Sequence, residues 1–194
     1  MKKTLSILIL AFLSISIFAA PFGLKMGMTL EDITEVCNGT EPKHIEHDCY
    51  YISPTKKHPL FKRYIAFVDN EKGLYCLKAI SNDIQTNKYG EELKNEFANI
   101  KERISKTYGK PRIIDKLEPD YLHKDEKYWL YAIEEGGRTY AAVWQSNSKT
   151  QLKDDLTYIT IYVSSKSYKN TGWITLQYDF SNKKAVEDSQ DDVF

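Results

Sequence analysis

The stretch LTYITIYVS, residues 156–164, decides the fold class because two kinds of side chain alternate along it. One set is aliphatic and the other ends in polar atoms: Ile159, Ile161 and Val163 against Tyr158, Thr160 and Tyr162. Successive side chains of a β-strand point to opposite faces of the sheet, so this alternation predicts a strand in a sheet with two different faces. The stretch GWITLQYDF, residues 172–180, alternates with Ile174 and Leu176 and predicts another strand.

Further stretches on the N-terminal side are also typical of strands. They are CYYIS at 49–53, RYIAFVD at 63–69, LYCLKAI at 74–80, KYWLYAI at 127–133 and TYAAVWQ at 139–145. The glycine-containing connections NEKG and EEGGR separate two pairs of these stretches and favour hairpins. Such short connections favour antiparallel pairing, because parallel strands need a long crossover.

Two helices are predicted. The first begins at Thr29, whose hydroxyl can accept from the backbone N–H of Asp32 while Asp32 reaches back, and it ends before Gly39. The second is longer, and its apolar residues recur at helical spacings: Leu93, Phe97, Ile100, Ile104 and Tyr108. Gly109 and Pro111 end it.

The order helix, three strands, helix, four strands predicts an α+β fold with two helices packed on an antiparallel sheet. We expect a signal peptide at residues 1–20 and a helix with antiparallel strands at residues 21–84. The long helix with its strands is expected at residues 85–182, and an acidic flexible tail at residues 183–194.

The first twenty residues have the layout of a secretory signal peptide. Lys2 and Lys3 precede the uncharged run LSILILAFLSISIF, and Ala19 and Ala20 offer two cleavage points. The run is shorter than the roughly 20 residues that a membrane span needs, so no stable membrane anchor is expected. The lysine- and isoleucine-rich composition suggests a bacterium, and hence a periplasmic or secreted protein.

The charge balance argues against a nucleic-acid partner. The chain has 27 basic and 27 acidic residues, and loss of Lys2 and Lys3 with the signal peptide leaves 27 − 2 = 25 basic residues. Nucleic-acid binding needs a concentrated positive face, which this balance does not provide. Hydrophobic residues make up 42% of the chain, enough for a core.

The stretch MGMTLEDITEVCNG, residues 26–39, resembles the opening of the beta-lactamase inhibitor protein family and of the small outer-membrane assembly lipoproteins that share its fold. The resemblance extends over residues 22–51. It implies binding of another protein and a helix-plus-sheet unit that occurs twice, as a tandem of two similar units. It also implies a disulfide between Cys37, at the end of the helix, and Cys49, on the first strand.

Other uses of the cysteines remain open from the residues alone. Cys37, His44, His47 and Cys49 are of zinc-ligand types, but their spacing matches no usual zinc finger, and an oxidising compartment favours a disulfide. Cys76 is either left unpaired or paired with one of the other two. We therefore assign no metal site.

No catalytic or cofactor-binding residue is assigned, and whether the protein is an enzyme stays undecided, leaning against. Gly-x-Ser-x-Gly and phosphate-binding loops do not occur in the sequence. We expect an exported, soluble binding or inhibitory module that contacts another protein. The alternatives are a periplasmic hydrolase acting on cell-wall or peptide substrates, and an accessory protein of envelope assembly.

The predicted partner surface is the set of aromatic residues that alternates with the aliphatic one. Tyrosine and tryptophan are enriched at binding hot spots because they combine a large apolar area with a polar tip. The expected residues are Tyr140, Trp144, Tyr158, Tyr162 and Trp173. The competing interpretation is that these aromatics form a second buried layer or cross-strand pairs.

Overall fold

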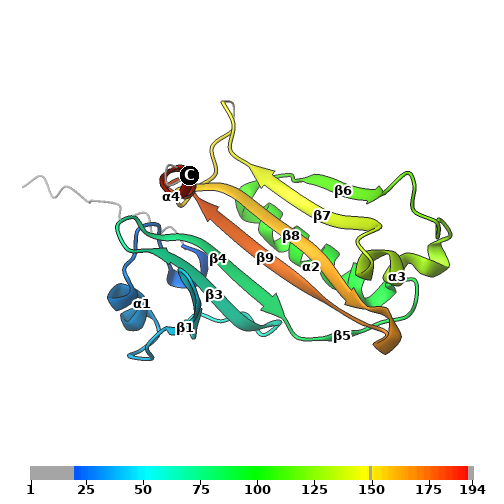
Figure 1. The fold of residues 1–194 in the computed structure, drawn as a ribbon, viewed down its shortest axis with the longest axis horizontal. Coiled ribbons are helices and arrows are strands. Elements are labelled where there is room, and N and C mark those ends of the chain that lie inside the picture. The colour runs from blue at the N-terminus through cyan, green and yellow to red at the C-terminus, as the bar shows by residue number, and fades with distance from the viewer. Residues whose placement is uncertain (1–19, 149, 192–194) are drawn as a thin grey trace, which may run out of the picture.

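The computed structural model of the chain describes residues 20–148 and 150–191 (Figure 1). The first half contains η1 (Pro21–Gly23), α1 (Leu30–Val36), β1 (Lys43–Glu46), β2 (Cys49–Ile52), β3 (Phe61–Asp69), β4 (Gly73–Ser81) and β5 (Ile84–Gln85). The second half contains α2 (Glu91–Tyr108), β6 (Arg112–Leu117), η2 (Glu126–Tyr128), α3 (Trp129–Glu134), β7 (Arg138–Gln145), β8 (Leu156–Lys166), η3 (Ser167–Lys169), β9 (Thr171–Phe180) and α4 (Lys183–Asp191). The predicted signal peptide lies outside the described residues except for Ala20.

The strands form one antiparallel sheet, which confirms the predicted α+β class. Within the described residues the sheet has nine strands, in the order β1-β2-β3-β4-β9-β8-β7-β6, with β5 paired to β9. The last long strands of the two halves, β4 and β9, pair at the centre, where Leu77 lies opposite Tyr178. The segments predicted at 21–84 and 85–182 therefore share one sheet.

The long helix α2 lies against the sheet as predicted. Leu93, Phe97, Ile100 and Ile104 are buried in the same core as Ile159 and Ile161 of β8. In Figure 1, α2 lies behind β8 and β9. The aliphatic side chains of the alternating stretch therefore face the helices.

The first helix has the predicted capping box. The backbone N–H of Asp32 donates to Thr29 Oγ1 at 3.2 Å, and the backbone N–H of Thr29 donates to Asp32 Oδ2 at 2.8 Å. Ile33 of α1 is fully buried in the same core as α2.

The stretch 127–133, predicted as a strand, is instead helical and forms the end of η2 with most of α3. Its buried side chains are Trp129, Leu130, Ala132 and Ile133, while Tyr131 is exposed. This pairwise spacing suits one face of a helix, whereas a strand would bury alternate residues. The fourth long strand of this half is β6, which the sequence did not indicate because its side chains are mostly exposed.

Residues 183–194 were expected to be a flexible acidic tail, but Lys183–Asp191 form α4. Val186 is fully buried against Tyr75 and Cys76 of β4. Lys183 Nζ lies 2.9 Å from Asp179 Oδ2, which joins the start of α4 to β9. One buried valine and one ion pair therefore hold a segment whose composition looked disordered.

The predicted Cys37–Cys49 disulfide is wrong, because the two thiols lie on opposite faces of the sheet. Cys37 packs in the core beneath α1, whereas Tyr50 and Ile52 are the residues of β2 on this core, so the side chain of Cys49 points to the other face. All three cysteines are buried and unbonded. Cys49 and Cys76 each lie opposite Phe67, on either side of β3. Cys49 and Cys76 are therefore two strand spacings apart, roughly 10 Å, which exceeds the Cα separation that a disulfide allows.

Candidate protein-binding face of the sheet

Among the described residues, helices cover one face of the sheet and leave the other face largely uncovered. α1, α2 and α3 contribute buried side chains to a single core on the covered face. On the opposite side, α4 packs at one end only, over Tyr75 and Cys76. We call the rest of this side, from β6 to β1, the open face.

A line of side chains crosses the open face from strand to strand. Directly opposite residues in paired strands point to the same face, so the register defines this line. Its members, in order from β6 to β1, are Arg112, Val143, Thr160, Gln177, Lys78, Ile65, Tyr51 and Lys43. Three members are cations and none is acidic, so the line favours a partner with negative charge.

Three of the five predicted aromatic residues lie on the open face. Tyr158 is 39% exposed, and Tyr162 and Trp173 are partly exposed. The register places Tyr162 opposite Thr175. Two residues further along β8, Ser164 lies opposite Trp173, so Tyr162 and Trp173 are diagonal neighbours. Diagonal neighbours of this kind are about 7–8 Å apart, so Tyr162 and Trp173 form one aromatic area.

Tyr140 and Trp144 lie on the covered face, contrary to the prediction. Trp144 lies opposite Ile159, is 2% exposed, and donates from Nε1 to the carbonyl of Gly109 at 2.7 Å. The Tyr140 ring packs between Phe97 and Trp129, with centroids at 4.6 and 5.5 Å. Both residues belong to the packing of α2 and α3 on β7.

A depression of about 670 Å³ lies where β8 ends and where β9 and β3 begin, away from α4. Its lining includes the open-face residues Arg63 and Trp173, and Lys166 and Lys169 from the β8–β9 connection. Asp83 is the one acid in the lining, and it pairs with Lys62 at 3.7 Å. The depression therefore extends the open face with additional positive charge.

The other end of the open face is closed by α4. Burial under α4 raises the pKa of the Cys76 thiol, and the nearby Asp179 carboxylate adds to this effect. The Tyr75 hydroxyl donates to the Asp48 carboxylate, and burial followed by this hydrogen bond raises the pKa of Tyr75. Both groups are protonated at neutral pH, so this end offers packing and no reactive thiolate.

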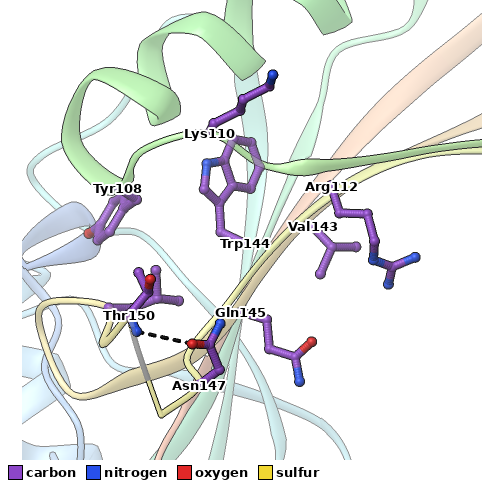
Figure 2. A pocket seen from close by; sticks show the side chains of 9 residues that line it. Tyr108, Lys110, Arg112, Val143, Trp144, Gln145, Asn147 and Thr150 are labelled. Atoms are coloured by element: carbon purple, nitrogen blue, oxygen red, sulfur yellow. Dashed lines mark hydrogen bonds between the residues drawn. The ribbon is translucent and has the colours of Figure 1, made fainter.

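Figure 2 shows a smaller pocket, of about 250 Å³, where the end of α2 meets β6 and β7. Trp144 points toward the end of α2, and the cations Lys110 and Arg112 point away from one another. The backbone N–H of Thr150 donates to Asn147 Oδ1 at 3.0 Å and shapes the rim. This pocket does not gather its charges at one point, unlike the depression beside Trp173.

Within residues 20–148 and 150–191, no group of three or more His, Cys, Asp or Glu side chains is placed to hold a metal ion. Of the suspected zinc set, His44 Nε2 donates to the carbonyl of His47 at 2.9 Å on the exposed hairpin of β1 and β2. No helix in this part of the chain has the length and apolar character to cross a membrane.

Comparison of the chain with known protein families, with curated proteins and with solved structures finds no match.

Proposed function

We propose that this chain is an exported binding or inhibitory module that holds another protein against its open face. The observation that carries the proposal is the placement of Tyr158, Tyr162 and Trp173 beside the cation-rich line, on a face that no described helix covers beyond its α4 end. Aromatic residues and arginine are the side chains most enriched at binding hot spots.

The rigidity of the scaffold also supports binding. The aromatics stand on β8 and β9, two interior strands of the sheet, whose other faces are anchored by buried Ile159, Ile161 and Ile174. A surface held by a packed core loses little conformational entropy on binding, so more of its contact energy appears as affinity.

The order of the elements supports a relationship to the inhibitor fold. In each half a helix precedes four strands that pair in sequence, β1 to β4 after α1 and β6 to β9 after α2. The two sets meet through β4 and β9, so their strand orders mirror one another. The halves differ in helix length and in α3, which lies between β6 and β7.

Buried thiols are compatible with the proposed export to an oxidising compartment. Burial raises the pKa of each of Cys37, Cys49 and Cys76, so each thiol has little of the thiolate that forms disulfides.

Site-specific photo-cross-linking in the source cells tests the proposed partner surface. A benzoylphenylalanine at position 162, on the open face, should give one discrete cross-linked product. The same group at position 98, an exposed alanine on α2, should give none. Cross-links from position 98 only would move the binding surface to the helices, and release of cell-wall or peptide fragments by the purified protein would favour the hydrolase alternative.

The cross-linked partner should then lose affinity for the Tyr158→Ala variant. Tyr89→Ala is the matched control, because Tyr89 precedes α2 and is as exposed as Tyr158, at 39%. Equal loss in both variants would argue against the open face.

A further inference from the structure

We infer that the depression beside Trp173 binds paired carboxylates on an acidic segment of the partner protein. This inference deepens the proposed function and rests on it for the identity of the open face as a binding surface. It assigns the partner a chemistry and the depression a separate role.

The cations of the depression come from separate elements that the fold brings together. Arg63 lies on β3, opposite Ile80, which itself lies opposite Thr175 of β9. Lys166 ends β8 and lies opposite Thr171, and Lys169 follows in η3. Arg63 and Lys169 are more than 100 residues apart in the sequence, yet all three cations line one depression.

These cations are available for a ligand. Arg63, Lys166 and Lys169 are all exposed, and among the described residues none of them forms an ion pair. Lys169 lies over the ring of Tyr168, 5.5 Å from its centroid. Lys166 lowers the pKa of Glu134, but this carboxylate is held mainly by the hydroxyl and the backbone N–H of Ser167. The positive charge of the depression is therefore largely uncompensated.

The size and the aromatic wall favour a peptide segment as the occupant. A volume of about 670 Å³ fits a few side chains and excludes a folded domain. Trp173 supplies apolar area, and its indole N–H makes no hydrogen bond to a described residue, so it can donate to a carboxylate. The planar fork of Arg63 can hold one carboxylate through two hydrogen bonds, and the lysines can hold a second.

The local charge contrasts with the chain as a whole. The full chain carries equal numbers of basic and acidic residues, whereas the lining has three cations and Asp83, a net of 3 − 1 = +2. Charge complementarity therefore points to an acidic occupant. Nucleic acid is disfavoured, because its phosphates would need a longer basic track.

NMR titration of the purified protein with a hexaglutamate peptide tests the inference. The chain has three tryptophans, and Trp129 and Trp144 are 1% and 2% exposed. We expect the indole N–H signal of Trp173, assigned with Trp173→Phe, to move while the other two stay fixed. Hexaglutamine should move none of them. The triple variant R63Q/K166Q/K169Q should bind hexaglutamate at least about tenfold more weakly.

The control variant R103Q/K106Q/K110Q removes one arginine and two lysines that are also exposed but lie in the last turns of α2 or just after it, and it should bind as the parent does. An unmoved Trp173 signal at millimolar peptide, or equal binding by R63Q/K166Q/K169Q, would overturn the inference. A response to inorganic phosphate or a DNA oligonucleotide but not to hexaglutamate would also overturn it. If the parent shows no hexaglutamate response while R63Q/K166Q/K169Q still cross-links to the partner through position 162, the depression is not the carboxylate site. The open face would then still be the partner-binding surface.

Discussion

The ring of Phe97 on α2 packs against the ring of Tyr140 on β7, with centroids 4.6 Å apart and planes at 50°. Trp129 of α3 packs on the same tyrosine at 5.5 Å. This aromatic contact ties both helices to one strand, and it explains why Tyr140 is unavailable on the open face.

Phe97→Ala should destabilise the protein by about 3–5 kcal/mol, because Phe97 is 1% exposed and its removal leaves a cavity between α2 and β7. Such a loss is a large fraction of the stability of a typical domain. Urea denaturation followed by tryptophan fluorescence measures it. Asn99→Ala, on the exposed side of the same helix, should change the free energy of unfolding little. Equal effects of the two substitutions would mean that α2 does not depend on this contact.

Gly90→Ala should destabilise more than Gly109→Ala, although both glycines have positive φ, 71° and 82°. An alanine at position 90, in the left-handed region, meets backbone strain of about 1–2 kcal/mol, and one at position 109, where ψ is −166°, meets about 1–3 kcal/mol. At position 90 the new Cβ would also overlap the ring of Trp129, whereas nothing lies within 4 Å at position 109. The overlap should add about 1–3 kcal/mol. Matching melting temperatures for the two variants would show that Trp129 moves aside without cost.

Part of this fold could be predicted from local patterns. The alternation at Ile159, Ile161 and Val163 and the spacing of Leu93 and Phe97 each report one element on its own, and both predictions are confirmed. β6 was missed because an edge strand with exposed side chains has little alternation to detect.

The composition of the open face could not be predicted, because it depends on register. Residues 146–155 connect β7 to β8, and so long a connection does not fix which residue lies opposite which. Trp144 therefore fell on the face of Ile159 and not on that of Tyr158. The cation-rich line and the depression are likewise assembled from strands far apart in the sequence, and no local motif marks them.

Asp32→Ala should lower the melting temperature near neutral pH, and this difference from the parent should disappear in acid. Hydrogen bonds from the backbone and then the side chain of Thr29 lower the pKa of Asp32 from its ordinary 3.8. A lowered folded-state pKa means that the stabilisation is fully present above the unfolded value and disappears as pH falls through the folded value. Melting temperatures of parent and variant should thus converge below pH 3.8.

Two further variants separate the capping box from general charge effects. Thr29→Ala removes the cap and should cost about 1 kcal/mol. Glu31→Ala removes a neighbouring exposed acid that makes no hydrogen bond to Thr29 and should show a smaller effect than Asp32→Ala. A gap between parent and Asp32→Ala that persists at low pH would contradict the role of the carboxylate.

The protein denatured without reductant should show three free thiols, and the native protein should react only slowly with a thiol reagent, because all three cysteines are buried and unbonded.

Val186→Ala should speed the reaction of Cys76 selectively. Removing about 1–2 kcal/mol of burial from α4 lets it open roughly tenfold more often. Cys37 lies under α1 on the other face and is the internal control. One free thiol in the denatured chain would mean that two of the cysteines form a disulfide. Equal acceleration at Cys37 and Cys76 would mean that the whole protein unfolds and that α4 does not open independently.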